Sequence, residues 1–176
     1  SFDWIPERLE DQQLIAAVPR GWNLAAMAPE QYKVPAPALS VGDRVVIGPQ
    51  DTVTCAPELV RITGNIAFTH TDASRSYLGK RLVYGGHTIS ITLAQVGRAL
   101  PNMLGLIGWQ GCEHTAPVLE EDIIRTEFTV TSETPLAAGG RLMELHALTF
   151  AKRAAADKKN YEESAVLDWR LVVWNL

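Results

Sequence analysis

The sequence is poor in the features that mark several large classes of protein. Only two of its 176 residues are cysteine, Cys55 and Cys112, which is too few for a disulfide framework and fits no metal-ligand spacing. No apolar run approaches the ~20 residues that span a bilayer. The acidic N-terminus lacks the charged-then-apolar order of a signal peptide. We therefore expect a cytoplasmic protein with no membrane segment and no structural metal ion.

Positive charge and nucleotide-binding motifs are also scarce. Sixteen Lys and Arg against twenty Asp and Glu give a net charge of -4, whereas nucleic-acid-binding domains usually carry a basic face. The sequence has no P-loop, no GxGxxG after a strand, no GxSxG elbow and no HExxH motif. We expect no nucleic-acid partner.

The chain divides near residue 40. Residues 1–39 hold five of the ten prolines, which predicts an N-terminal arm or linker, with one short helix within residues 6–18 and an extended linker over residues 33–43. Over residues 40–176, apolar residues recur with the regular spacing of helices and strands. With 47% hydrophobic residues in the chain, this part is long enough to form one well-cored domain.

One long helix and several strands are predicted in this domain. Residues 87–100 carry apolar side chains at Ile89, Leu93, Val96 and Leu100, a helical spacing, and have few polar residues, which predicts a helix buried on most sides. A shorter helix is expected to break at Gly64. One buried helix inside an antiparallel sheet is an α+β arrangement. Alternating side chains predict strands over residues 122–134 and 141–153. The Gly-rich, apolar residues 103–115 and the β-rich residues 164–176 are predicted to form two more strands.

The four histidines differ in their surroundings. His114 and His146 fall on predicted strands, and His87 begins the long helix, so we interpret these three as structural. His70 falls instead in a loop between two short helical segments, and such loops often hold a general acid or base. His70 is therefore the candidate for proton transfer.

The sequence Tyr84-Gly85-Gly86 comes just before the long helix. Two glycines allow the backbone to approach a ligand closely, and the first free N–H groups of a helix can bind a carbonyl oxygen or an oxyanion. The alternative is a tight turn that merely requires glycine. Ser90, one turn into the helix, can orient a ligand or hydrogen-bond back to the preceding turn. We include Tyr84, both glycines and Ser90 as candidate substrate-binding residues.

Several segments resemble one family in order and spacing. The segments VGD, TVTCAPELVRITGNIAFTHTDA, LGKRLVYGGHTIS and HTAPVLEEDIIRTEFTV are similar to MaoC-like (R)-specific enoyl-CoA hydratases, over roughly residues 40–176. GKRLVYGGHTIS is most similar to mesaconyl-CoA hydratases and their double hot-dog relatives. The resemblance implies a hot-dog fold, an antiparallel β-sheet wrapped around a long central α-helix. It also implies a homodimer or a partner hot-dog domain.

The resemblance further implies an activity and a site. The reaction would be reversible hydration of a 2-enoyl-CoA to a 3-hydroxyacyl-CoA, with coenzyme A as part of the substrate and no separate cofactor. The family motif Asp-x-Asn-Pro-aliphatic-His aligns its His with His70 and its Asp with Asn65, and the glycine that polarises the thioester aligns with Gly85, beside Gly86. Because Asn65 cannot take a proton, His70 would carry the proton transfer while the Asn65 amide orients water. Asp72 is the alternative partner.

Two other functions stay open on the sequence. A hot-dog acyl-CoA thioesterase would need a carboxylate to activate water, and Glu58 and Asp72 are the candidates near the motif. A catalytically weak acyl-CoA-binding subunit would fit the replacement of the motif's Asp by Asn65. Release of free thiol distinguishes the thioesterase, because hydration leaves the thioester intact.

Overall fold

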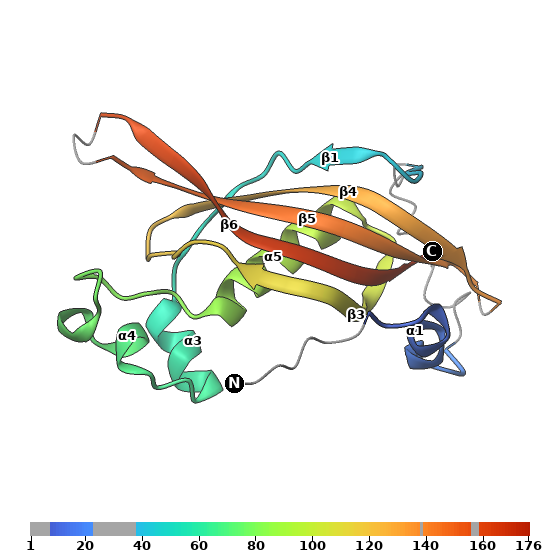
Figure 1. The fold of residues 1–176 in the computed structure, drawn as a ribbon, viewed down its shortest axis with the longest axis horizontal. Helices are drawn as coiled ribbons and strands as arrows, with labels where there is room; N and C mark the ends of the chain where they lie inside the picture. The colour runs from blue at the N-terminus through green and yellow to red at the C-terminus, as the bar shows by residue number, and fades with distance from the viewer. Residues whose placement is uncertain (1–7, 23–37, 138, 156–158) are drawn as a thin grey trace.

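The computed structural model describes residues 8–22, 38–137, 139–155 and 159–176. Residues 33–37 of the predicted linker lie outside them, as do residues 1–7 and 23–32 of the predicted arm. The described residues form one antiparallel sheet in the order β1-β4-β5-β6-β3, with β2 also paired to β4 (Figure 1). The strands are β1 (Arg44–Val46), β2 (Asp51–Thr52), β3 (Met103–His114), β4 (Ile123–Pro135), β5 (Arg141–Ala154) and β6 (Tyr161–Asn175).

The long strands follow the alternation that predicted them. On β4, every second residue from Ile124 to Val130 is buried, and the residues between them are half-buried. The register pairs Ile124 with Ala151 and Val130 with Leu145 on β5. Since side chains alternate between the two faces of a strand, this pairing directs one face of each strand into a common core.

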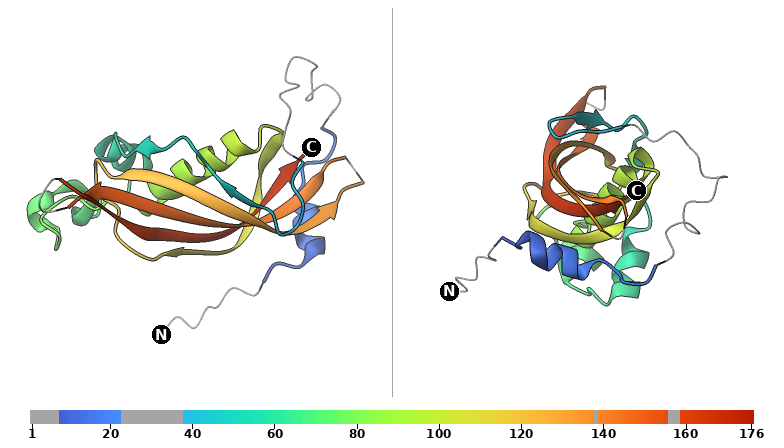
Figure 2. Two further views of the ribbon diagram at one scale, coloured as in Figure 1. Left: turned by 90° about the horizontal axis from the view of Figure 1, so that it is seen from above. Right: turned by 90° about the vertical axis from the view of Figure 1, so that its right-hand side faces the viewer.

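Helix α5 (Gly85–Ala99) lies in the hollow of the curved sheet, as the end-on view of Figure 2 shows. Val96 and Leu100 are buried in the main core, as predicted. Three polar residues of the helix, Thr88, Thr92 and Gln95, are buried beside these apolar side chains. The helix is therefore held to the sheet partly through polar contacts.

Those polar contacts join α5 to three strands. Thr92 Oγ1 lies 2.8 Å from Thr149 Oγ1 on β5, and Thr149 Oγ1 lies 3.1 Å from Thr126 Oγ1 on β4. Gln95 donates to the Asp51 carboxylate of β2 at 2.6 Å and to a main-chain carbonyl of β4 at 2.9 Å. Buried polar groups that find partners in this way fix the position of a helix as well as its burial.

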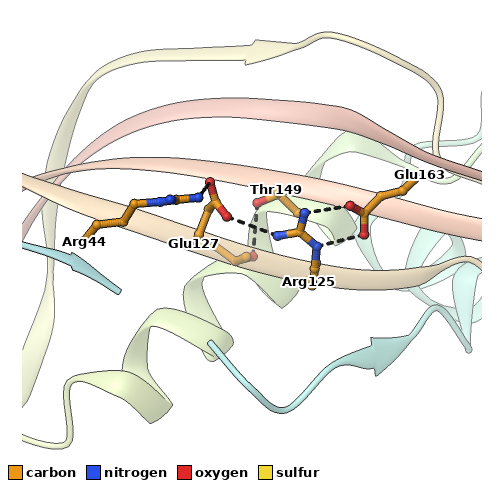
Figure 3. A network of polar contacts seen from close by, with 6 residues as sticks. Arg44, Arg125, Glu127, Thr149 and Glu163 are labelled. Carbon is orange, nitrogen blue, oxygen red and sulfur yellow. Dashed lines mark hydrogen bonds and ion pairs between the residues drawn. The ribbon is translucent and has the colours of Figure 1, made fainter. Parts of the chain in front are cut away.

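The opposite face of the sheet is covered at one end by helix α1 (Asp11–Ala17), which lies outside the sheet in Figure 2. Leu14 and Val18 pack there with apolar residues of β5 and β6. Farther along the same face, a chain of ion pairs crosses the sheet (Figure 3). It runs from Arg44 to Glu127, to Arg125 and to Glu163 with N–O distances of 2.7, 3.2 and 2.6 Å.

The remaining helices lie together at one end of the sheet, near the first residue of α5 (Figure 1). They are α3 (Ala56–Thr63), α4 (Phe68–Thr71) and the 3₁₀ turn η2 (Ala73–Arg75). Gly64 ends α3 with φ of +70°, as the predicted break requires. None of the helices within the described residues is long and apolar enough to cross a membrane.

Candidate functional site

A cavity of about 450 Å³ opens at the N-terminal end of α5. Its wall comes from three parts of the chain. The connection into α5 contributes His70, Tyr77, Leu82 and Val83, and the start of α5 contributes Gly85 and Thr88. The third part is the last residue of β3 with the segment that follows it, residues 114–118. The structure thus brings His70 and Gly85, two of the residues proposed from the sequence, into one cavity.

His70 lies in α4, a single helical turn, and not in the loop that the sequence predicted. Its Nδ1 lies 2.7 Å from the main-chain oxygen of Leu82. A carbonyl oxygen only accepts hydrogen bonds, so Nδ1 carries the proton and Nε2 keeps a free lone pair. This contact therefore prepares Nε2 of His70 to accept a proton.

The segment around Leu82, which accepts this hydrogen bond, is itself held by hydrogen bonds to the two neighbouring parts of the cavity wall. The Leu82 N–H donates to the Thr69 carbonyl at 2.9 Å, and the Val83 N–H donates to the Val118 carbonyl at 2.9 Å. Leu82 also forms an isolated β-bridge with Leu119. These bonds tie the α4 turn and the segment after β3 together, so the cavity wall has a defined shape.

Helix α5 begins at Gly85 without a side-chain cap. The His87 N–H donates to the Tyr84 carbonyl at 2.8 Å, whereas the structure gives the N–H groups of Gly85 and Gly86 no acceptor within the described residues. The first N–H groups of a helix have no intrahelical partner and carry the positive end of its dipole. The Gly85 amide can therefore bind a carbonyl oxygen in the cavity.

Neighbouring rings explain why both positions are glycine. A Cβ atom on Gly85 would lie 2.6 Å from Nε2 of His114, and one on Gly86 would lie 2.6 Å from the Tyr84 ring. Real Cβ atoms do not approach other atoms so closely. The glycines thus make room for two aromatic rings as well as exposing main-chain N–H groups.

His114, which we interpreted from the sequence as a structural strand residue, also lines the cavity. It is the last residue of β3, and its ring lies against the first residue of α5. Although the residue as a whole is exposed, partial desolvation of the His114 imidazole lowers its pKa, so its neutral form is favoured. The sequence offered one weak signal, a histidine where a strand ends; its contact with Gly85 depends on tertiary packing.

The other candidate residues lie outside the cavity wall. Asp72 accepts hydrogen bonds from the Ser74 hydroxyl at 2.7 Å and the Ser74 N–H at 2.9 Å, which lower the pKa of its carboxyl group. Ser90 donates to the Gly86 carbonyl at 2.7 Å, the hydrogen bond to the preceding turn that the sequence left open. Asn65 is half-buried and is not among the lining residues.

Tyr84 lies beside the cavity without being part of its wall. Its ring centroid is 6.1 Å from that of His70, in an edge-on arrangement. The same ring lies against Gly86, and Gly86 is not among the residues that line the cavity. Of the two glycines, Gly85 is therefore the one that faces the site.

Comparison with known proteins adds a structural relationship. No protein-family model and no curated protein sequence matches the chain. A conserved hypothetical protein from Mycobacterium tuberculosis, essential for bacterial survival during infection and with a double hot-dog fold, is 36% identical with a TM-score of 0.74. That match covers 100% of this chain and 54% of the mycobacterial chain.

Two more distant structures have the same fold. A MaoC-domain protein from Chloroflexus aurantiacus is 20% identical, with a TM-score of 0.65 over 98% of this chain and 50% of its own. The (R)-hydratase from A. caviae involved in PHA biosynthesis is 17% identical, with a TM-score of 0.56; the match covers 80% of this chain and 100% of the hydratase. The predicted hot-dog fold is confirmed. This chain spans about half the length of the mycobacterial protein and of the Chloroflexus aurantiacus protein.

Proposed function

We propose that this hot-dog protein, whose structural relatives include MaoC-like dehydratases and (R)-hydratases, is an acyl-CoA hydro-lyase. The reaction is the reversible hydration of a 2-enoyl-CoA to a 3-hydroxyacyl-CoA. One observation carries the proposal: the His70 imidazole borders the same cavity as Gly85, whose main-chain N–H has no acceptor among the residues that the structure describes. A base and a carbonyl-binding donor are the two groups that this chemistry requires.

The Gly85 amide supplies the electrophilic half of the reaction. The thioester oxygen of the substrate accepts a hydrogen bond from the Gly85 N–H, which draws electrons from the conjugated double bond and makes C3 electrophilic. When hydroxide adds at C3, negative charge moves to the thioester oxygen as an enolate, where the helix N-terminus stabilises it. This interaction strengthens as charge develops, so it lowers the barrier more than it aids binding.

The His70 imidazole moves the proton. Nε2 accepts a proton from water as the water oxygen bonds to C3, and the resulting imidazolium then returns that proton to C2 of the enolate. The hydrogen bond from Nδ1 to Leu82 O holds the ring in place and stabilises the imidazolium. Water is consumed, His70 ends neutral, and no redox change occurs, so the chemistry needs no cofactor.

The candidate carboxylates for a thioesterase mechanism do not line the cavity. Asp72 is engaged with Ser74, and Glu58 lies exposed in the first turn of α3; neither lines the cavity. A thioesterase reaction through either residue therefore lacks a supporting contact. Asn65 can orient the attacking water only if its side chain reaches the cavity when substrate binds, and we keep that role as part of the proposal.

We also propose that the chain functions with a second hot-dog unit, either another copy or a further domain. Two observations support this: β3 is an edge of the sheet within the described residues, and the chain spans 54% of its double hot-dog relative. Unpaired main-chain groups along an edge strand are suited to pairing with another strand. Light scattering of the purified chain distinguishes a dimer from a monomer, and a monomer would contradict self-pairing.

The activity is tested by following the absorbance of a conjugated enoyl-CoA, such as crotonyl-CoA, with the His70→Ala variant. We expect turnover by the wild-type chain and a loss of about 10²- to 10⁴-fold in the variant, the usual contribution of a general acid–base group. His146→Ala is the matched control, because His146 bonds Asp168 at 2.9 Å on the sheet and does not line the cavity. Equal turnover by wild type and His70→Ala would contradict the proposal.

A parallel assay for free thiol uses the same samples. We expect no release of coenzyme A during enoyl-CoA consumption, because hydration leaves the thioester bond intact. Thiol release at the rate of substrate loss would instead identify a thioesterase.

A further inference from the structure

His114 differs from His70 and His146 in the hydrogen bonds of its ring within the described residues. His70 and His146 each have a ring nitrogen in a hydrogen bond, to Leu82 O and to Asp168 respectively. Across the described part of the chain, the structure gives neither ring nitrogen of His114 a hydrogen-bond partner, although its ring borders the cavity. An imidazole that faces a cavity without a partner is available to a ligand.

The position of this ring relates it to the helix start. Among the His114 ring atoms, Nε2 lies nearest to the position that a Cβ on Gly85 would take, 2.6 Å away. Gly85 and His114 both line the cavity, so a carbonyl oxygen bound there by the Gly85 amide would share that cavity with the His114 ring. A neutral imidazole with a proton on Nε2 is a hydrogen-bond donor, and enzymes use neutral histidine to polarise carbonyl groups.

We propose that His114 donates a hydrogen bond from Nε2 to the thioester carbonyl oxygen and forms, with the Gly85 N–H, a two-donor oxyanion site. This inference rests on the proposed function and assigns a second donor to it. His70 would then handle the proton of water, while His114 and Gly85 share the charge of the enolate. The lowered pKa of His114 agrees with a neutral donor at neutral pH.

A purely structural role for His114 makes a different prediction. If the ring only fills space against Gly85, then phenylalanine, which has a similar flat ring and no N–H, should replace it without loss. Glutamine has a smaller, flexible side chain but retains an N–H donor at a similar distance from the main chain. His114→Phe and His114→Gln therefore separate shape from hydrogen bonding.

The direct test is the absorption spectrum of bound 2,4-hexadienoyl-CoA, which moves to longer wavelength when its carbonyl is polarised. The measurement uses the His70→Ala background, in which turnover of the probe is slow. We expect a clear red shift in this background, most of the shift lost on adding His114→Phe, and part of it kept with His114→Gln. In the otherwise wild-type chain, His114→Phe should lower kcat by about 10²- to 10³-fold, as loss of one oxyanion donor does, with a smaller effect on KM.

The outcomes separate this inference from the proposed function. A full red shift with His114→Phe overturns the role of His114 alone, whereas failure of the His70→Ala chain to bind the probe contradicts the acyl-CoA site and this inference together. Melting temperatures of both His114 variants within a few degrees of wild type show that the fold is retained. If His114→Phe does not fold, His114→Gln is compared with His114→Ala in the same His70→Ala background. A red shift of the bound probe that is no larger in His114→Gln than in His114→Ala overturns the inference.

Discussion

Thr92 of α5 and Thr149 of β5 share a hydrogen bond between their hydroxyl groups, 2.8 Å long, and neither residue has any solvent exposure. The Thr92 hydroxyl also donates to the Thr88 carbonyl, 2.9 Å away, and Thr149 also contacts Thr126. A buried hydroxyl that loses its partner retains the cost of its desolvation. Removing one hydroxyl from this hydrogen-bonded chain between the helix and the sheet should therefore lower the stability of the protein.

Replacing Thr149 by valine is expected to destabilise the protein. The change keeps the shape of the side chain but leaves the buried Thr126 hydroxyl without its partner, at a cost of about 1 to 2 kcal/mol. Urea denaturation measures the change. Thr129→Val is the matched control, because Thr129 lies on the other face of β4 and is partly exposed. Equal stability of Thr149→Val and Thr129→Val would contradict the assigned role.

Gly140, in the turn between β4 and β5, should not tolerate a side chain. Its φ is +72°, and an added Cβ would lie 2.5 Å from the main-chain oxygen of Asn175 at the end of β6. Main-chain atoms in paired strands cannot easily move aside, so Gly140→Ala carries both conformational strain and a clash. We expect a loss of roughly 3 kcal/mol or more in the free energy of unfolding.

Gly42→Ala is the matched control for this change. Gly42 also has a positive φ, +95°, but nothing lies within 4 Å of an added Cβ. Its cost should therefore be conformational strain alone, about 1 to 2 kcal/mol. If denaturation shows the two alanine variants to be equally stable, the close approach of Asn175 to Gly140 is not a constraint.

Stability is expected to fall as the pH drops below the ordinary histidine pKa of 6.5. Desolvation lowers the pKa values of both His87 and His114 in the folded chain. As the pH falls, these two imidazoles therefore take up protons in the unfolded chain first, which favours unfolding. Above pH 6.5 they are neutral in both the folded and the unfolded chain, and their contribution to the free energy of unfolding is fully present. Hydrogen bonds from Arg125 lower the pKa of Glu163, so that carboxyl adds its own loss only below its ordinary value of 4.5.

Urea denaturation at pH 7.5, 6.5 and 5.5 isolates the contribution of the histidines, because the lowest of these pH values is still above the pH at which carboxyl groups take up protons. The free energy of unfolding should decline over this series in the wild type and decline less steeply in His114→Phe, which lacks one of the two groups. A stability that rises as the pH falls from 7.5 to 5.5 would contradict the assignment.

Much of the fold follows from local patterns in the sequence. The alternation from Ile124 to Val130 predicted the inward face of β4 because one face of each strand must reach the core. Helix α5 followed from the spacing of Val96 and Leu100, and the end of α3 from Gly64, whose left-handed conformation suits glycine. Each of these features is decided by residues close together in the sequence.

The rest depends on contacts between distant parts of the chain. Thr92 and Gln95 are buried because Thr149 and Asp51 supply partners, and nothing near them in the sequence announces this. His114 enters the cavity because the end of β3 meets the start of α5. The family motif aligns Asn65 with a catalytic position, but alignment fixes a residue's place in the chain and not the direction of its side chain.

The close fit of Gly85 and His114 also has an evolutionary consequence. The two positions share one small volume, so a side chain at residue 85 can be accepted only if residue 114 becomes smaller or its ring swings away. Substitutions at these positions should therefore occur together across related sequences. A lineage that gave up the ring at residue 114 would be freed from the requirement for glycine at residue 85 and could then explore other chemistry at the entrance of the helix.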